Sequence, residues 1–569
     1  MRQLYCFLVL GLTLSIFTAR AQVNATGALQ GTVTDKSGAV VPHAEVKITE
    51  KATGSARSST TGDAGLYRFE LLPAGTYEIT VSVAGFATAK YENVGVAVSQ
   101  TTTIDVSLTP STQSQVITVE ATGTPLIDTE RNDVSLPIST KQIQDLPLNG
   151  RDFVNLAYLA PGARPVNSYD PTKNRIGVFG VDGSSGRNVN VTVNGIDDKD
   201  NTVGGPVMQL PLEAVDQFVI STQRFSAANG RSEGALITAI TKSGTNNYHG
   251  SLYLFDRNQA LNANDYFSKL GNSPKPDYGR QQFGGSIGGP VRKDKDFLFF
   301  ALERERESTN IAVSPTAFSE LSLAKANGFS SAQPVNAIPT PYFDWRYNGR
   351  WDHRFNERNN MFVSYTNQHN NGQNDQVNSQ SELTGGNFTT NQLILASVNI
   401  NSVITPTIVN SVTIGYQYWN NLIDSTIRAN NIAFGAGETI GTNVNVPQQS
   451  FQKKWQFKDD LSITRGKHSF KVGFDYLWEP ILGGFFENNP TPTIAFFDDP
   501  SKILSDKTNY PLGFQTPGAV SSITETAGNP YFILATKMFG VYFQDDWKIS
   551  RRFTLNLGLR YDQIGRAHV

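Results

Sequence analysis

The chain has almost no thiol, little net charge and no long apolar segment beyond its start. Cys6 is the single cysteine in 569 residues, so a mature protein without its first residues has no disulfide and no thiolate metal site. The formal net charge is -2 and only 17% of the residues are charged, so nothing in the composition suggests electrostatic binding of nucleic acid. After the first twenty residues no apolar run is long enough for a transmembrane helix, although membrane-crossing β-strands escape such a search.

Motifs of catalytic and metal sites are absent or misplaced. Gly284–Gly288 matches G-x-S-x-G, but it lies inside a predicted strand, whereas a nucleophilic serine needs a strand–turn–helix elbow. The acidic run "DDKDN" at 197–201 lacks the glycine and the distal glutamate of a calcium loop, so we expect a solvated turn there. No metal-ligand spacing joins the six histidines, which are His43, His249, His353, His369, His468 and His568. We therefore expect no enzyme, no resident metal and no cofactor.

Residues 1–21 have the pattern of a signal peptide. Arg2 supplies the positive end, Leu4–Phe17 is the apolar stretch, and Ala19-Arg20-Ala21 is a small-x-small cleavage site. The alternative, an N-terminal membrane anchor, is disfavoured because the apolar stretch is short. We expect an exported protein that begins at Gln22.

Residues 27–108 are predicted to form a small β-sandwich. Short alternating strands such as "ALQGTVTD" and "AEVKITE" are separated by Gly, Pro and Asp at regular intervals. The stretches "GTVTDKSGAVVPHAEVKI", "TTGDAGLYRFELLPAGTYEITVSVAGF" and "VSLTP" resemble the carboxypeptidase-regulatory-like family. This resemblance implies a transthyretin-like, carbohydrate-binding-like fold in an accessory domain. It implies neither peptidase activity nor a sugar site.

A polar linker follows at 109–124, and it contains one β-prone fragment, "QVITVEA". Two interpretations stay open. The fragment is either the last edge strand of the sandwich, or a segment to which an outside partner adds a strand through main-chain hydrogen bonds. In the second case the pairing residues are Val116, Ile117, Thr118, Val119 and Glu120.

Residues 125–246 are predicted to form a compact α+β domain. A helical spacing in "ISTKQIQDLPLNGRDFVNLAYLAPGA" is broken at Pro147 and Pro161, and "NVNVTVNGIDD" and "GALITAITKSG" read as strands.

From residue 247 to residue 563 the hydrophobic period is mostly two. In "FKVGFDYLW", Phe470, Val472 and Phe474 fall on one face and Lys471 and Asp475 on the other. The connections between such strands alternate between long and short, as in outer-membrane barrels with short periplasmic turns and long external loops. We predict eleven strands: Tyr248–Phe255, Gln281–Gly289, Phe297–Glu303, Trp345–Phe355, Met361–Tyr365, Leu393–Val403, Val412–Trp419, Trp455–Ile463, Phe470–Trp478, Phe539–Trp547 and Phe553–Tyr561.

Several long motifs resemble the plug-to-barrel passage of TonB-dependent outer-membrane transporters, in particular their Oar-like branch. They are "VNGIDD", "LEAVDQFVI", "FSAANGRSEGALITAITKSGTNNYHGSLYLFDRN" and "QFGGSIGGPVRKDKDFLFFALERERE". The resemblance covers nearly all of the mature chain and implies a plug at 125–246 and a barrel from 247 onward. Asn194 departs from the aspartate that the family often has, so no special role is assigned to it.

The resemblance implies an importer in the outer membrane of a Gram-negative-type bacterium, with the sandwich and plug on the periplasmic side. Its partners would be TonB with its inner-membrane energising complex, outer-membrane lipid, and a solute such as a glycan, a peptide or a metal chelate. Residues 116–120 would be the TonB box. Two alternatives remain: an Oar-like structural or adhesive surface protein, and a sugar-binding module on a barrel anchor.

Polar contacts are expected to seat the plug against the inner barrel wall, because a charge left unpaired in a partly dry lumen is costly. The plug candidates are Arg231 and Glu233 in "NGRSEG". The inward-facing wall candidates are Arg346, Arg350 and Asp352 in "WRYNGRWDHRF".

The strand count indicates an incomplete barrel. Eleven strands are half of the about twenty-two in plugged outer-membrane transporters. The final residues 564–569, "IGRAHV", break the alternation and match a translated sequencing adapter, so we expect a non-native tail on an N-terminal fragment.

Overall fold

The computed structural model describes residues 26–565 of the chain except 112–115, 121–133, 167–178, 182, 188, 203, 224–225, 233, 265, 267–268, 270–274, 276, 376–381 and 551–552. The predicted signal peptide, the candidate Glu233 and residues 566–569 of the predicted tail lie outside the described residues. Among the described residues, no helix has the length and apolar character needed to cross a membrane.

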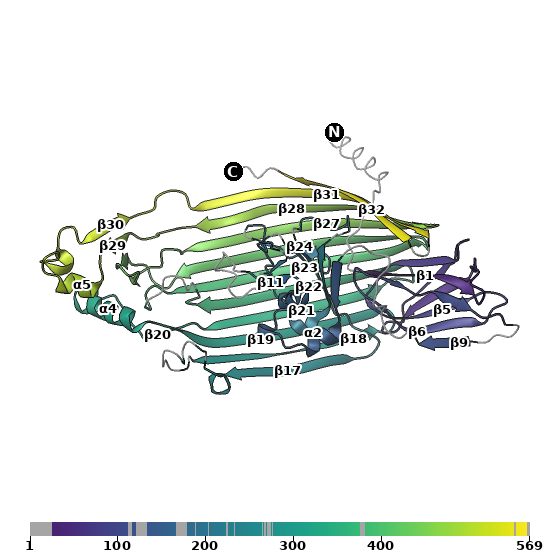
Figure 1. Cartoon of the computed structure of the whole chain (residues 1–569), viewed down its shortest axis with the longest axis horizontal. Coiled ribbons are helices and arrows are strands. Elements are labelled where there is room, and N and C mark those ends of the chain that lie inside the picture. Colours follow the sequence, from purple (N-terminus) through teal and green to yellow (C-terminus); the bar gives the residue numbers. More distant parts are fainter. Residues whose placement is uncertain are drawn as a thin grey trace, which may run out of the picture.

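A large antiparallel sheet dominates the molecule (Figure 1). Its main path contains all eleven predicted strands in sequence order, and β17 and β32 form the two edges. A short strand, β20 (Ala337–Pro339), pairs with β19. The strands are β17 (His249–Asn258), β18 (Tyr278–Arg292), β19 (Asp296–Ala312), β21 (Tyr342–Arg354), β22 (Asn359–Gln373), β23 (Asn387–Thr405), β24 (Ile408–Ser425), β27 (Gln448–Arg465), β28 (His468–Phe486), β31 (Tyr531–Ser550) and β32 (Phe553–Ile564).

The two faces of this sheet differ as the alternating pattern predicts. Leu298, Phe300 and Trp351 are between 39% and 49% exposed on one face. Glu303 and Arg346 on the other face are at most 3% exposed. An apolar outer face suits lipid, and a polar inner face suits a lumen.

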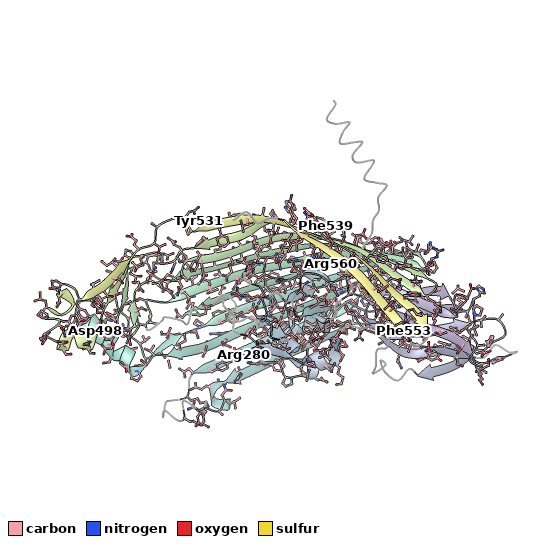
Figure 2. All side chains as sticks on the ribbon, turned by 45° about the horizontal axis from the view of Figure 1, so that its top comes forward. Arg280, Asp498, Tyr531, Phe539, Phe553 and Arg560 are labelled. Atoms are coloured by element: carbon pink, nitrogen blue, oxygen red, sulfur yellow. The ribbon has the colours of Figure 1, made fainter. Side chains whose placement is uncertain are left out.

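The long and short connections lie at opposite ends of the sheet. In Figure 2, Asp498 in a long connection lies far from Phe553, which follows the short turn after β31. The long connections after β19, β24 and β28 fold together around a core that includes Leu321, Phe434 and Phe496. These three connections contain α4 (Pro315–Ala326), α5 (Pro500–Ser505), η7 (Gly513–Gln515), and the small sheet of β25 (Asn431–Ala433), β26 (Thr439–Ile440), β29 (Thr493–Phe496) and β30 (Val520–Thr524). The connection after β17 contains η5 (Gln259–Leu261).

The N-terminal sandwich lies at the short-turn end (Figure 1). One sheet joins β1 (Gly27–Asp35) to β4 (Leu66–Leu72), β7 (Thr101–Thr103) and β8 (Val106–Leu108). The other has the order β3-β2-β5-β6-β9, with β2 (Glu45–Glu50), β3 (Ala56–Thr60), β5 (Gly75–Ser82), β6 (Thr88–Val96) and β9 (Val116–Glu120). Leu29, Ile48, Phe69 and Ile79 are buried between the two sheets.

The α+β domain packs against the polar face of the large sheet. Its own sheet has the order β10-β15-β16-β13-β14. Leu393 and Trp419 of the barrel wall belong to the same buried core as its Phe153, Phe179 and Phe218. Its elements are β10 (Val134–Ile138), α2 (Thr140–Asp145), η1 (Asn149–Arg151), η2 (Phe153–Leu159), β11 (Ala163–Pro165), β12 (Phe179–Val181), β13 (Asn190–Val193), β14 (Ile196–Asp197), η4 (Leu212–Ala214), β15 (Val215–Gln223) and β16 (Leu236–Thr241).

Candidate functional site

The first polar contact between the inner domain and the wall is centred on Arg346 of β21, and we call it the Arg346 seat. The Arg346 guanidinium is nearly fully buried. It donates to Asp344 at 2.8 Å and to Glu303 at 3.0 Å, both on the wall. It also donates to Asp152 of the inner domain at 2.9 Å, and Glu305 lies 3.6 Å away. One cation thus joins four carboxylates from the two parts of the molecule.

Arg151 adds a second cation to the Arg346 seat from the inner domain. Its guanidinium donates to Glu303 and to Glu213, each at 3.2 Å. It also lies 4.2 Å from the ring centroid of Tyr253, whose hydroxyl donates to Glu303 at 2.6 Å. Burial raises the pKa of Asp152 to about 6, although the guanidinium of Arg346 opposes this rise. Carboxylates outnumber cations in the Arg346 seat, so its charge balance depends on Arg346 and Arg151.

The second contact is the loop Asp197–Asn201, which we call the loop seat. Asp197, Asp198, Lys199 and Asp200 are at most 8% exposed. The prediction of a solvated turn is therefore wrong: the wall covers the loop and supplies partners to it. Lys454 of β27 donates to the Lys199 carbonyl, and its ammonium nitrogen lies 3.8 Å from Asp197.

Amides and a second lysine of the wall complete the loop seat. Lys458 donates to the carbonyl of Gly195 at 2.6 Å. The side-chain oxygen of Gln456 accepts from the backbone N–H of Asp197 at 2.9 Å. Gln452 donates to Asp200 at 2.6 Å. Many of these bonds end on the main chain of the loop, so they hold its backbone shape.

Arg231 supports the loop seat from within the inner domain. Its guanidinium forms an ion pair with Asp197 and donates to the side-chain oxygen of Asn201 at 2.9 Å. Burial alone would raise the pKa of Asp197, but Arg231 and Lys454 hold it well below its ordinary value. Arg231 itself has a raised pKa: its burial opposes the charged form, but Asp197 outweighs that effect. Arg231 thus stabilises, from the inner domain, the same loop that the wall binds from the other side.

The other two predicted wall residues form one pair. Arg350 donates to Asp352 at 2.7 Å and to the backbone carbonyl of Thr241 at 2.9 Å. Its guanidinium lies 4.2 Å from the ring centroid of Phe362. Arg350 therefore contacts the inner domain directly, while Asp352 orients Arg350.

Close packing accompanies these polar contacts. Asn194, at φ +50°, donates to Ser364 of β22 at 3.0 Å and accepts from the backbone N–H of Thr241 at 3.0 Å. Gly415 of β24 leaves room for Ile196, because a Cβ at Gly415 would come within 2.3 Å of the Ile196 side chain. A side chain at Gly415 would push the inner domain off the wall.

The β-prone fragment of the linker is strand β9 of the sandwich. It pairs in parallel with β6, from Thr88↔Val116 to Glu92↔Glu120. It ends its sheet, so its other edge has no neighbouring strand among those described. This placement matches the edge-strand interpretation and leaves strand addition at the outer edge open.

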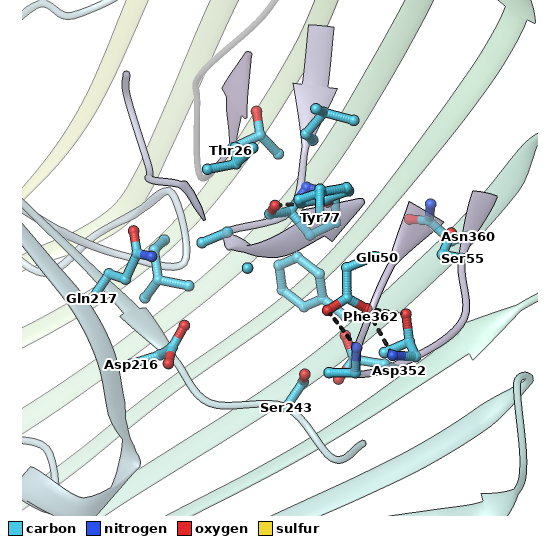
Figure 3. Close-up of a pocket in the computed structure, with 18 of the residues that line it drawn as sticks. Thr26, Glu50, Ser55, Tyr77, Asp216, Gln217, Ser243, Asp352, Asn360 and Phe362 are labelled. Carbon is cyan, nitrogen blue, oxygen red and sulfur yellow. Dashed lines mark hydrogen bonds between the residues drawn. The ribbon is translucent and has the colours of Figure 1, made fainter. Parts of the chain in front are cut away.

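A cleft of about 1540 Å³ separates the sandwich from the inner domain and the wall. Figure 3 shows Glu50 and Tyr77 of the sandwich on one side and Asp216 and Gln217 of the inner domain on the other. The G-x-S-x-G match lies inside β18, in the predicted strand context. In the described part of the chain, no group of three or more His, Cys, Asp or Glu is arranged to hold a metal ion.

Two family models match the chain. A model described as an outer membrane beta barrel domain matches residues 240–344 and 319–568. A carboxypeptidase regulatory-like domain matches residues 28–109.

Known proteins are similar to parts of the chain, among them one transporter by sequence and one by structure. The TonB-dependent transporter Oar of Myxococcus xanthus is 29% identical over 163 residues, which are 26% of this chain and 14% of Oar. The crystal structure of the outer membrane transporter YddB from Escherichia coli superposes with a TM-score of 0.54 at 12% identity, over 76% of this chain and 56% of YddB. The chain thus covers about half of the length of YddB and a small part of Oar, and the likeness to YddB is one of fold.

Proposed function

Because the chain belongs to the outer membrane β-barrel family, we propose that it is a receptor that imports a scarce or bulky solute through a plugged barrel, with energy supplied by TonB. The protein lies in the outer membrane of a Gram-negative bacterium. In this proposal the inner domain is the plug, and the long connections are external loops that meet the solute.

The seating of the plug carries the proposal. Wall residues of β19, β21 and β27 bind it through the two seats, so a large solute passes only when the plug shifts. Most of these contacts are hydrogen bonds and ion pairs, whose polar groups bond to water instead when the plug moves, so the net cost of breaking each hydrogen bond is small.

A TonB partnership supplies what the outer membrane lacks, which is an energy source of its own. The transporter Oar, similar over a short part of the chain, is named as TonB-dependent. Strand β9 provides an extended segment on the periplasmic side to which a partner strand can add. Residues 116–120 are therefore the proposed coupling segment.

Growth on a panel of glycans, peptides and chelated metals tests the proposal. A strain that lacks this gene should grow more slowly on at least one of these solutes, and loss of TonB should cause the same defect. Ile117→Pro should abolish uptake while surface abundance persists, because proline removes a main-chain donor. Solute uptake that continues without TonB would reject the proposal.

A structural or adhesive surface role is the second candidate. The folded external loops, with Phe329, Phe434, Phe496 and Phe514 in mutual ring contact, favour a stable surface for recognition. An adhesive protein would keep its surface phenotype in a strain without TonB, whereas an importer would lose its function.

A further inference from the structure

The sandwich is fastened to the plug at one well-defined contact. Val98 is fully buried and packs with Val219 and Ile240 of the plug. Its backbone N–H donates to the side-chain oxygen of Gln217 on β15 at 2.7 Å. The sandwich therefore reaches the central strands of the plug sheet.

The sandwich has two further anchors, one at the end of the plug and one on the barrel rim. The backbone N–H of Asn246 donates to the carbonyl of Ala52 at 2.9 Å. Ser469 at the start of β28 donates to Glu70 at 2.9 Å. Several anchors at separate points hold the sandwich in one orientation beneath the plug.

Strand β9 is linked to Val98 through β6. β9 pairs with β6, and Val98 follows the last residue of β6, Val96, by two positions. A force along β9 loads all five residue pairs between β9 and β6 together, because it runs along the strands and across the hydrogen bonds that join them. Such a force would reach Val98, and through Val98 the plug.

The two edges of the sandwich sheet differ in sequence. The edge strand β3 reads "ARSST", with one charged and three small hydroxyl side chains. The edge strand β9 reads "VITVE", in which the first four residues are β-branched. Both edge strands have five residues and one charge, so they differ in the β-propensity of their other side chains, which is higher in β9. The backbone of β9 is already extended, so a partner strand binds without first ordering it.

We propose that the sandwich presents β9 as a docking edge for an extended strand of the periplasmic coupling partner, and that a pull on this edge reaches the plug through β6 and Val98. This inference rests on the proposed function, and it assigns a mechanical role to the sandwich. The partner adds a strand beside β9 while β9 stays paired with β6.

A disulfide between β6 and β9 tests whether β9 stays on the sandwich. Lys90 and Thr118 are register partners, so Lys90→Cys with Thr118→Cys in a Cys6→Ser background provides the only two thiols. The full chain in isolated outer membranes is oxidised or reduced, and capture by the purified periplasmic domain of TonB is measured. We expect the disulfide to form and capture to change by less than about threefold on oxidation. Failure of the disulfide to form, or a larger loss of capture that a reductant reverses, would overturn the proposal.

A second experiment tests the path of the pull. Ile196→Cys places a thiol on a plug residue that is 1% exposed, and a maleimide–polyethylene glycol reagent reports its exposure in cells with and without TonB. Val98→Asp should lower TonB-dependent labelling by about tenfold, because a charge at this buried contact separates the sandwich from the plug. Lys47→Asp, on the exposed face of β2, is the matched control and should leave labelling unchanged.

Different results would reject the proposed function and the inference about the sandwich. If TonB neither captures the otherwise unmodified chain nor alters its labelling, the proposed function fails. If capture and TonB-dependent labelling are present but Val98→Asp labels like the control, only the inference about the sandwich fails.

Discussion

The Arg346 seat and the loop seat fasten the same plug by different physical means. At the Arg346 seat, two arginines hold five carboxylates, which are Asp152, Glu213, Glu303, Glu305 and Asp344. At the loop seat, lysine and glutamine side chains of the wall bind mainly carbonyl and N–H groups of the plug main chain. The stability of the Arg346 seat depends on charge balance, and the stability of the loop seat depends on the backbone shape of the loop.

In the proposed function, this difference would let the plug be held firmly and still be released. Removing one cation from a carboxylate-rich site leaves several uncompensated buried charges, so the effect is large. Removing one of many main-chain contacts leaves the others in place, so the effect is small. The comparison predicts a ranking of variants.

Arg346→Ala should have the largest effect. It leaves Asp152, Glu303 and Asp344 without their shared cation, which costs about 3–5 kcal/mol for a buried ion pair that loses one partner. The plug should loosen, and cells should become sensitive to large antibiotics. Arg306→Ala on the same part of the sheet is the control, because Arg306 is exposed. Equal antibiotic sensitivity of the two variants would contradict a seating role for Arg346.

Arg231→Ala should have an intermediate effect on the same leakage assay. Asp197 loses its closest cation but keeps Lys454 at 3.8 Å, so the cost should lie below the about 3–5 kcal/mol of a buried ion pair that loses one partner. The double variant with Asp197→Asn should leak less than Arg231→Ala alone, since the buried charge is then gone. A double variant that leaks more would show that Arg231 acts elsewhere.

Lys458→Met should have a smaller effect still. It removes a single hydrogen bond to the carbonyl of Gly195, worth about 1 kcal/mol net, and a long apolar side chain keeps the packing. Thermal unfolding in detergent should show a modest decrease in stability without antibiotic leakage. Leakage as large as that of Arg346→Ala would reverse the ranking of the two seats.

Acid should act on the two seats in opposite directions and in different pH ranges. The pKa of Asp152 in the seated plug is about 6, against an ordinary 3.8. The seated plug therefore binds a proton at Asp152 more tightly than the unseated plug does. The contribution of Asp152 to seating grows as the pH falls through 6. The lowered pKa of Asp197 means that its contribution is intact at neutral pH and begins to be lost only below about 3.8. Leakage should therefore be lowest between these two pH values, and Asp152→Asn should remove the change near pH 6.

The barrel strands could be predicted because their signal is local. Alternation located all eleven, but it placed the ends too far inward: the strand predicted at Leu393–Val403 extends over Asn387–Thr405. The additional residues are mostly polar on both faces, so they carry no period-two signal. Inward alternation also identified Arg346 and Arg350 as wall residues that contact the plug.

The loop seat could not be predicted in the same way. Asp200 and Gln452 are 252 residues apart in the chain, and no local pattern relates them. The run "DDKDN" looks like a solvated turn because exposed acidic runs are common, and its burial depends on a wall that the local sequence does not show. The pairing of β9 with β6 was one of two interpretations, and the sequence carries no signal that separates them.

A disulfide that locks the plug to the wall tests the central claim most directly. Ile196→Cys with Gly415→Cys joins positions that are already in contact, and the shorter side chain at 196 removes the Cδ1 atom that a Cβ at Gly415 would otherwise meet. Uptake of the solute found in the growth panel is then measured in oxidised and in reduced cells, with Ile196→Cys alone as control. The account predicts that oxidation abolishes uptake and that a reductant restores it. Unchanged uptake through a locked plug would contradict the account.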